Sequence, residues 1–325
     1  MCTRAVYLGL DDMVITGRNM DWAEDLQTNL WLFPRAMPRD GAIDAQSITW
    51  RSRFGSVVAA GYDVGTADGM NERGLVANVL YLTESDYGRP DGSKPTISVG
   101  AWAQYVLDNH ATVADAVAAL RSEPFVVVAP ALPNGRAASV HLAISDASGD
   151  SAIFEYIGGV LKIHHDRAYQ VMTNSPVFEE QLALNTYWRR IGGMTMLPGT
   201  ERAADRFVRA SFLIDAVTKT GEAREAVATS LAVMRALSVP PGIKVENQPS
   251  LSTTVWRTVA DQKNRVYYYE HVLSPGALWV KLDELDFKAG SGVRTLRLAH
   301  RYDIIGDATA RFTRARPFQF SALAA

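Results

Sequence analysis

The chemistry of this chain centres on its single cysteine, which stands at position 2, directly behind Met1. If Met1 is removed, Cys2 becomes the first residue and carries both a thiol and a free α-amine. The thiol is a nucleophile, and an α-amine, with a reference pKa near ~8, accepts its proton close to neutral pH. Cys2 could therefore act as a catalytic unit without a histidine. The alternative is an accidental cysteine in a flexible start of the chain.

Arg18 and Asp21 are the next candidates for this site. A cation beside a thiol favours the thiolate, and a carboxylate can orient and stabilise a protonated amine. Three positions separate the two residues, so on a flat strand their side chains point to opposite faces. Convergence on one site would need a bulge or a strand end near Asn19–Met20. The alternative is a surface ion pair, which would contribute little to stability.

A β-hairpin is the element that must position these residues. Residues 2–9 and 14–22 are strand-like, and Leu10-Asp11-Asp12-Met13 between them has the composition of a turn. The second strand folds back along the first. The hairpin therefore returns Arg18 and Asp21 toward Cys2.

Strand-like and helical blocks alternate along the rest of the chain. Helical spacing is found at 97–109, 113–120, 176–187, 202–219 and 222–237, and strand-like runs at 30–33, 56–61, 76–82, 140–146, 151–157, 160–165, 169–173, 253–261, 265–271 and 278–281. Thr112 is expected to cap the second helix, and the apolar, proline-flanked segment 125–133 is expected to be a loop. Neither an internal repeat nor a linker is visible. We expect a single α+β domain spanning residues 1–325, with mainly antiparallel sheets.

Composition narrows the classes of function. The net charge of −2 offers no basic field for nucleic acid, and no run approaches the ~18 apolar residues of a membrane helix. A single cysteine excludes an internal disulfide and a cysteine-rich metal site. The six histidines show no metal-ligand spacing, and the pair His164-His165 is expected to be solvated in a turn. Phosphate loops and G-x-S-x-G elbows are absent from the sequence. We therefore expect no nucleic-acid partner, membrane span, metal or cofactor.

Five motifs in a fixed order carry a resemblance to a known family. They are Cys2-Thr3-Arg4, Arg18-Asn19-Met20-Asp21-Trp22, Asn71-Glu72-Arg73-Gly74-Leu75 with Tyr81, Met172-Thr173-Asn174-Ser175-Pro176, and Leu197-Pro198-Gly199 with Asp205-Arg206-Phe207-Val208-Arg209-Ala210. Together they resemble the choloylglycine hydrolase family of penicillin V acylases and conjugated bile salt hydrolases, over about residues 2 to 285. The resemblance implies an N-terminal nucleophile hydrolase with an αββα sandwich, in which two antiparallel sheets lie between helical layers. It also implies hydrolysis of a linear amide bond without a cofactor.

The resemblance assigns roles to individual residues. Cys2 matches the nucleophile, Arg18 the arginine beside the thiol, and Asp21 the carboxylate beside the amine. Asn174 matches the asparagine that helps to form the oxyanion hole, and its alternative is a turn residue before Ser-Pro. Arg206 matches the distal arginine of the site, and its alternative is a helix-surface arginine.

Tyr81 and Trp22 bear on the substrate. Penicillin V acylases often carry tyrosine at the position of Tyr81, where bile salt hydrolases carry asparagine, and a backbone N–H near it is expected to assist Asn174. Asp21-Trp22 resembles the Gram-negative branch, which includes acylases of N-acyl homoserine lactones. Trp22 would line an apolar acyl pocket, or it belongs to the core. The loops at 22–30, 62–66 and 125–140 are expected to shape this pocket. Penicillin V acylase activity is favoured; bile salt hydrolysis and a non-catalytic scaffold are the alternatives.

The sequence also bears on the oligomeric state and the cellular compartment of the protein. The resemblance implies a homotetramer, and the tail, about residues 286–325, is a candidate for contacts between subunits. Within it, the basic and aromatic run from Arg311 to Phe320 could also be a solvated terminus. Met1 could stand in place of a cleaved signal peptide, which would make the protein periplasmic. Otherwise the protein is expected to be cytoplasmic.

Overall fold

The computed structural model of the protein describes residues 2–133, 135, 138–192, 195–243 and 252–320. Met1, on whose removal a free α-amine at Cys2 depends, lies outside the described residues. So do residues 134, 136 and 137 of the expected pocket loop and residues 321–325 of the tail.

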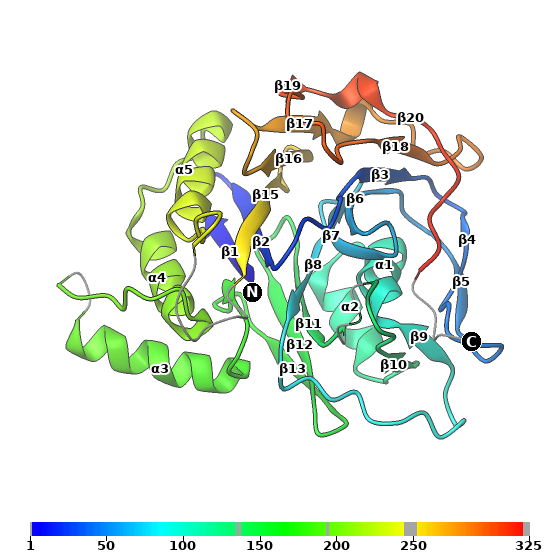
Figure 1. Cartoon of the computed structure of the whole chain (residues 1–325), viewed down its shortest axis with the longest axis horizontal. Helices are drawn as coiled ribbons and strands as arrows, with labels where there is room; N and C mark the ends of the chain where they lie inside the picture. Colours follow the sequence, from blue (N-terminus) through cyan, green and yellow to red (C-terminus); the bar gives the residue numbers. More distant parts are fainter. Residues whose placement is uncertain (1, 134, 136–137, 193–194, 244–251, 321–325) are drawn as a thin grey trace.

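Seven strands form the sheet that begins with Cys2, in the spatial order β14-β1-β2-β15-β16-β17-β19. Neighbouring strands are antiparallel, except that β17 and β19 run parallel. The strands are β1 (Cys2–Leu8), β2 (Val14–Trp22), β14 (Val171–Met172), β15 (Thr253–Asp261), β16 (Val266–His271), β17 (Leu278–Lys281) and β19 (Gly306–Asp307). The sheet thus joins the N-terminal hairpin to the C-terminal third of the chain (Figure 1).

Nine antiparallel strands form the second sheet, in the order β13-β12-β11-β8-β7-β6-β3-β18-β20. They are β3 (Leu30–Phe33), β6 (Ser56–Gly61), β7 (Gly65–Asn71), β8 (Val76–Tyr81), β11 (Val140–Ser145), β12 (Ser151–Ile157), β13 (Val160–His165), β18 (Arg294–Leu296) and β20 (Thr313–Arg314). Two small sheets pair β4 (Pro38–Asp40) with β5 (Thr49–Arg51), and β9 (Thr96–Ser98) with β10 (Val126–Val128).

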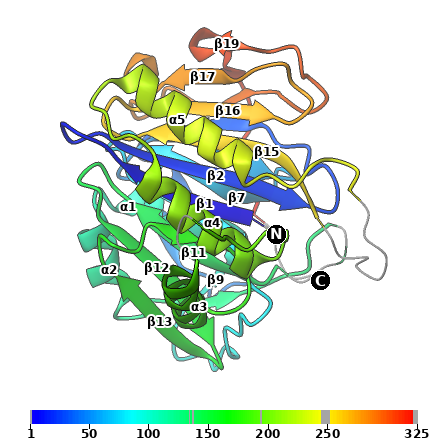
Figure 2. The same ribbon diagram turned by 90° about the vertical axis from the view of Figure 1, so that its left-hand side faces the viewer.

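Helices cover the outer faces of the two large sheets. On the second sheet, α1 (Val99–Asn109) packs against β7 and β8, and α2 (Val113–Leu120) against β12. On the first, α4 (Ala203–Ala216) packs against β1, α5 (Ala223–Ala236) against β2 and β15, and α3 (Phe178–Ile191) against α4. The inner faces meet where β1 and β2 contact β8. Figures 1 and 2 show the resulting layers, which confirm the expected αββα sandwich. Two 3₁₀ turns, η1 (Leu282–Glu284) and η2 (Thr309–Arg311), complete the elements.

The hairpin β1–β2 is buried on both faces. All nine residues of β2 are buried, because the second sheet covers one face and α5 covers the other. The polar residues of β2 are therefore buried like its apolar ones. Arg18, Asn19 and Asp21 are all fully buried. Buried charges in a strand need specific partners, since desolvation of an unpaired charge is costly. This requirement marks the strand as part of a site.

Two segments differ from the sequence-based expectations. Segment 125–133, expected to be a loop, contains β10, which pairs in parallel with β9. The helix expected at 97–109 begins only at Val99, because the residues before it belong to β9 and Ser98 caps the helix by accepting the N–H of Gly100. A short apolar run has no periodicity that separates a strand from a helical turn, so the distant pairing partner decides.

The tail is part of the sandwich. Its strands β18 and β20 extend the second sheet, and the ring of Phe318 packs edge-on against Trp31 and Phe33, with centroid distances of 5.3 and 5.6 Å. A role of this tail in contacts between subunits stays a prediction. Within the part of the chain that the structure describes, none of the helices combines the length and the apolar character needed to cross a membrane.

Candidate active site

Cys2 lies between the two sheets at the start of β1, with 2% of its surface exposed. β1 and β2 pair without interruption from Leu8↔Val14 to Cys2↔Met20. This register brings the Cys2 Sγ to 3.7 Å from Met20 Sδ and to 3.6 Å from Arg18 Nη2. The hairpin predicted from the sequence therefore places a guanidinium beside the thiol.

Arg18 reaches from β2 toward the second sheet. Its Nη2 donates to the carbonyl of Val79 in β8 at 2.9 Å, and its guanidinium lies over the ring of Trp256, 4.6 Å from the centroid. Such stacking orients a buried guanidinium. Among the described residues, its Nε and Nη1 have no hydrogen-bond partner. The positive charge of Arg18 is thus only partly neutralised by hydrogen bonds.

Asp68 in β7 is a buried carboxylate whose charge acts on Arg18. It accepts hydrogen bonds from Asn78 Nδ2 at 2.6 Å, from Thr258 Oγ1 at 3.1 Å and from the Tyr267 hydroxyl. Burial raises the pKa of Asp68, and the Arg18 charge and these three donors oppose the rise. The sequence analysis did not select Asp68; a carboxylate between Ala67 and Gly69 inside a strand was the only available signal.

Asp21 points to the opposite face of β2, toward the helices. Its Oδ1 accepts the hydroxyl of Thr254 at 2.6 Å, and its Oδ2 lies 3.7 Å from Arg206 Nη1. β2 needs no bulge for this arrangement. The irregularity lies in the neighbouring strand β15, between Thr254 and Trp256, opposite Asp21 and Met20. Arg18 and Asp21 therefore approach Cys2 from two faces, as their spacing on a flat strand predicts.

Arg206 is fully buried at the inner face of α4. Its Nη1 donates to the carbonyl of Cys2 at 2.6 Å and also to the Thr3 hydroxyl, and its Nη2 donates to Asn174 Oδ1 at 2.9 Å. Burial lowers the pKa of Arg206, and the charge of Asp21 opposes this effect. Arg206 is therefore no helix-surface arginine, because it joins α4 to the first residues of β1.

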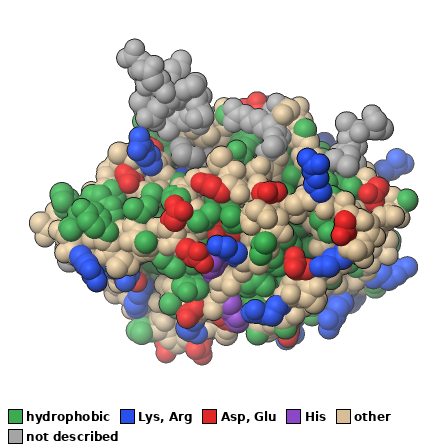
Figure 3. All heavy atoms as spheres, turned by 90° about the horizontal axis from the view of Figure 1, so that it is seen from below, with side chains coloured by type: hydrophobic (Ala, Val, Ile, Leu, Met, Phe, Trp, Pro, Cys, Tyr) green, Lys and Arg blue, Asp and Glu red, His purple; other side chains and the backbone are tan. Residues whose placement is uncertain are grey.

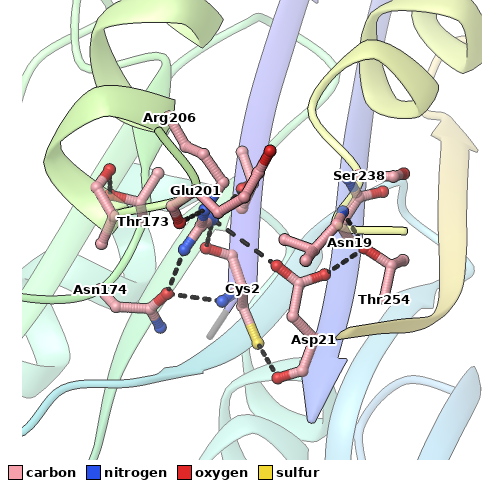
Figure 4. Close-up of polar contacts among 12 residues, drawn as sticks. Cys2, Asn19, Asp21, Thr173, Asn174, Glu201, Arg206, Ser238 and Thr254 are labelled. Atoms are coloured by element: carbon pink, nitrogen blue, oxygen red, sulfur yellow. Dashed lines mark hydrogen bonds and ion pairs between the residues drawn. The ribbon is translucent and has the colours of Figure 1, made fainter. Parts of the chain in front are cut away.

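Asn174 follows β14 and lies beside the backbone of Cys2. Its Oδ1 accepts a hydrogen bond from the backbone N–H of Cys2 at 2.5 Å, and its Nδ2 donates one to the carbonyl oxygen of Tyr81 at 2.6 Å. Figure 4 shows Cys2, Asp21, Asn174 and Arg206 pointing toward one another from different elements. Tyr81 contributes its carbonyl here. The next backbone N–H, that of Leu82, donates to Ser139 at 3.0 Å.

A pocket opens over the side chains of Cys2 and Arg18. It holds about 740 Å³ of space, counting the part open to solvent. Trp22 and Tyr81 line it, with their ring centroids 6.0 Å apart, and Trp22 Nε1 donates to the Tyr62 hydroxyl at 3.0 Å. Most other lining side chains are aliphatic, and among the described residues Arg18 is the only charged one. The pocket suits an apolar, uncharged group.

All the residues selected from the sequence thus lie in one region. Cys2, Arg18, Trp22 and Tyr81 face the pocket, whereas Asp21, Asn174 and Arg206 surround the backbone of Cys2. Thr254 and His141 were missed: Thr254 has no motif around it, and His141 was considered only as a metal ligand. The expectation for His164 was wrong, because it lies within strand β13 and its side chain is only 11% exposed, beside Glu155.

The described residues were also compared with the ligand sets of metal sites. Among the described residues, no group of three or more histidine, cysteine, aspartate or glutamate side chains is arranged to hold a metal ion. The groups around Cys2 are a thiol, two guanidiniums, a carboxylate and an amide. They can supply a nucleophile, positive charge and hydrogen-bond donors.

Comparison with known proteins agrees with this constellation. The profile of the linear amide C–N hydrolases, choloylglycine hydrolase family, matches residues 2–295. The chain belongs to the choloylglycine hydrolase family. The resemblance of the five motifs is thereby confirmed, and this member of the family is a hydrolase of linear amides.

Relatives within the choloylglycine hydrolase family differ in how closely they match. A penicillin V acylase from Pectobacterium atrosepticum is 46% identical over 99% of this chain and 92% of its own length. A bile salt hydrolase/transferase from Clostridium perfringens is 29% identical over 67% of this chain and 73% of its own. The greater identity and coverage of the first relative favour the acylase side.

Among solved structures, too, a penicillin V acylase is more similar to this chain than a bile acid hydrolase is. A penicillin V acylase from Agrobacterium tumefaciens superposes with a TM-score of 0.93 at 51% identity, covering 99% of this chain and all of the other. A conjugated bile acid hydrolase from Clostridium perfringens reaches a TM-score of 0.78 at 21% identity, covering 93% and 99%. The second likeness shows the shared fold.

Proposed function

We propose that this choloylglycine hydrolase family member is an acylase of the penicillin V type, with Cys2 as its nucleophile after removal of Met1. The observation that carries the proposal is the position of the Cys2 thiol, 3.6 Å from Arg18 Nη2 at an apolar pocket. Similarity over 99% of the chain to a penicillin V acylase supports the same reaction.

The first step of the proposed reaction is proton transfer within Cys2. Once the α-amine is free, it takes the thiol proton, and Asp21 and Arg206 keep the backbone of Cys2 in place on the helical side. Arg18 stabilises the thiolate, because a fixed cation nearby favours the charged form. The thiolate then attacks the amide carbon, and a carbon–sulfur bond forms while the carbonyl oxygen becomes an oxyanion.

Asn174 is the proposed donor to this oxyanion. Its Nδ2 carries two protons, one of which is directed to the Tyr81 carbonyl, and the second can be donated to substrate. One donor of this kind is typically worth about 10²- to 10³-fold in rate. The carbon–nitrogen bond then breaks as the α-ammonium gives its proton to the leaving nitrogen. Water, deprotonated by the same amine, hydrolyses the thioester, which releases the acid and restores the thiol.

The pocket supports an aromatic or long apolar acyl group as the proposed substrate. Trp22 and Tyr81 offer two aromatic faces, and the remaining lining is mainly aliphatic. A phenoxyacetyl group fits this chemistry, as does the acyl chain of an N-acyl homoserine lactone. Bile salt hydrolysis is the second candidate, because a bile salt hydrolase/transferase is 29% identical over two thirds of the chain.

Hydrolysis rates test this proposal. Protein whose intact mass shows loss of Met1 is given penicillin V, an N-acyl homoserine lactone and glycocholate in parallel. We expect turnover of the first two to exceed that of glycocholate. Faster turnover of glycocholate would replace the proposal by bile salt hydrolysis. As a control, Cys2→Ala should lose about 10⁴-fold or more in kcat while remaining folded, and retained activity would refute Cys2 as the nucleophile.

We further propose that the protein forms a homotetramer. An exposed apolar stripe on α3 supports association between subunits: Leu184, Tyr187 and Ile191 lie on one helical face and are 39%, 57% and 45% exposed. Figure 3 shows hydrophobic side chains gathered on the side of the molecule where α3 lies in Figure 1. Light scattering should give four times the monomer mass of 35.6 kDa. The variant Tyr187→Glu should lower that mass, and a monomeric wild type would refute the proposal.

A further inference from the structure

A buried cluster of His141, Glu155 and His164 lies behind the segment that carries Asn174. His141 in β11 and Glu155 in β12 are both fully buried. The Nδ1 of His141 lies 2.9 Å from Glu155 Oε1, and its Nε2 lies 2.9 Å from the carbonyl oxygen of Thr173. Because Thr173 directly precedes Asn174, the ring of His141 supports the residue next to the proposed oxyanion donor.

Both hydrogen-bond partners of His141 are acceptor groups. A carbonyl oxygen and a carboxylate can only accept, so each ring nitrogen must donate a proton. Glu155 is ionised, because its two oxygens also receive the Phe178 backbone N–H at 3.2 and 3.1 Å, and His164 Nε2 lies 3.4 Å from Oε2. Burial raises the pKa of Glu155. The hydrogen bonds with His141, His164 and Phe178 outweigh that effect and lower the pKa to about 2. Both ring nitrogens of His141 therefore face acceptors, one of which is a carboxylate.

Glu155 also anchors the start of α3. The N-cap residue of this helix, Val177, offers no side-chain cap, and the Glu155 carboxylate receives the N–H of Phe178 in its place. An anion at a helix N-terminus is favourable, because the first N–H groups have no partner within the helix. Further along α3, Gln181 donates to the carbonyl oxygens of Asn174 and Pro176. The segment from Thr173 to Phe178 is thus held at both ends by the same cluster.

We infer that His141 is a positioning residue for amide hydrolysis: a buried, doubly protonated imidazole that, paired with Glu155, holds the Thr173 carbonyl and so fixes the Asn174 side chain beside Cys2. This inference rests on the proposed function, because it assigns a purpose to the fixed position of Asn174. His141 itself does not line the pocket. Its effect on the reaction passes through Asn174.

Nitrogen NMR of the wild-type protein tests the protonation state without any substrate. In protein labelled with ¹⁵N-histidine, His141 should show protons on both ring nitrogens at neutral pH, and its signals are assigned by elimination, from single His→Gln variants of the other five histidines. Glu155→Gln should abolish the doubly protonated state, because a neutral amide no longer stabilises the imidazolium. A wild-type His141 with one unprotonated ring nitrogen would overturn the inference, whatever substrate the enzyme turns over.

Kinetics of His141→Gln tests the positioning role. Glutamine has one amide nitrogen where the imidazole ring has two separate ones, so it cannot reproduce both contacts of His141. Asn174 should therefore shift, and misplacement of about 1 Å costs up to about 10²-fold in rate. We expect kcat for penicillin V to fall about 10- to 100-fold while KM changes less than about threefold, since His141 lies outside the pocket. A folded His141→Gln protein with wild-type kcat would overturn the role.

His165→Gln is the matched control. His165 follows His164 in β13 and its Nε2 lies 2.8 Å from Asp150 Oδ2, but both side chains are partly exposed and this pair does not contact the Asn174 segment. The control should keep wild-type kcat and KM, and an equal loss in both variants would overturn a role specific to His141. If His141→Gln does not fold, the NMR result on the wild type decides. If the wild type hydrolyses no penicillin V, the proposed function fails, and the NMR result still stands.

Discussion

Two buried arginines flank Cys2, and they are held in different ways. Arg206, on the helical side, donates to two backbone carbonyls, the Thr3 hydroxyl and Asn174, and lies 3.7 Å from the Asp21 carboxylate. Arg18, on the pocket side, has one backbone acceptor and an aromatic ring, and two of its nitrogens lack a partner among the described residues.

This difference in hydrogen bonding indicates a structural role for Arg206 and a role in the reaction for Arg18. A guanidinium whose donors are all engaged holds its neighbours in fixed positions but has little capacity left for a new charge. A buried guanidinium with unused donors retains a strong field, because desolvation is not repaid by hydrogen bonds. Arg206 therefore holds the backbone around Cys2, and we expect Arg18 to act on the thiol and on a substrate bound in the pocket.

The largest effect on stability should follow loss of Arg206. Arg206→Met removes the cation 3.7 Å from the buried carboxylate of Asp21, and breaking a buried pair in this way costs about 3–5 kcal/mol. Urea unfolding measures this change. Arg189→Met on α3 is the control, because Arg189 and its partner Asp215 are 63% and 59% exposed, and should cost at most about 1 kcal/mol. An equally small loss in Arg206→Met would contradict the supporting role of Arg206.

The next effect concerns Glu155 and the stability of the protein in acid. The pKa of Glu155 is about 2 in the folded protein, below the value of about 4.3 in an unfolded chain. A lowered carboxyl pKa contributes stability that is present above the unfolded pKa and is lost as pH falls through the folded one. We expect the stability advantage of the wild type over Glu155→Gln, about 3 kcal/mol at neutral pH, to shrink as pH falls from about 4.5 toward 2. A constant difference across this range would contradict the ion pair with His141.

Loss of Arg18 should affect chemistry more than folding. Arg18→Leu removes the cation beside the thiol, and we expect kcat/KM to fall about 10²-fold and alkylation of Cys2 by iodoacetamide to slow at neutral pH. Stability should fall by only about 1–2 kcal/mol, because Asp68 keeps three hydrogen-bond donors. If Arg18→Leu destabilised the protein as much as Arg206→Met does, the distinction between the two arginines would fail.

The smallest effect on activity should follow loss of the Thr254 hydroxyl. Thr254→Val keeps the shape of the side chain but removes one hydrogen bond to Asp21, which typically contributes about 1.5–3 kcal/mol when the acceptor is charged. Unfolding should show a loss near the lower end of that range. Since Asp21 keeps Arg206 nearby, kcat should fall less than in Arg18→Leu. A loss of kcat greater than in Arg18→Leu would contradict this order and place Asp21 closer to the chemistry than Arg18.

Much of the fold was predictable because the local patterns were strong. The strands at 14–22, 151–157, 160–165, 253–261 and 278–281 have the bounds that their composition indicates, and Thr112 caps α2 by accepting the N–H of Asp115. Strand β10 was missed, because three apolar residues become a strand only through pairing with β9.

The sequence by itself determined the reactive group and its nearest neighbour. A lone cysteine at position 2 and a hairpin of fixed register are local features, so Cys2 and Arg18 could be brought together on paper. The family motifs added Asn174 and Arg206, although nothing in their spacing shows where they lie.

Only the tertiary structure decided how these groups divide their work. Arg206 became a buried support because α4 packs on β1, and Asp68, Thr254 and His141 entered the site from strands far apart in the chain. Hydrogen bonds between such strands depend on how two sheets and two helical layers stack, and no local pattern encodes that packing. The sequence therefore determined which atom we propose as the nucleophile, and the packing decided which charges surround it.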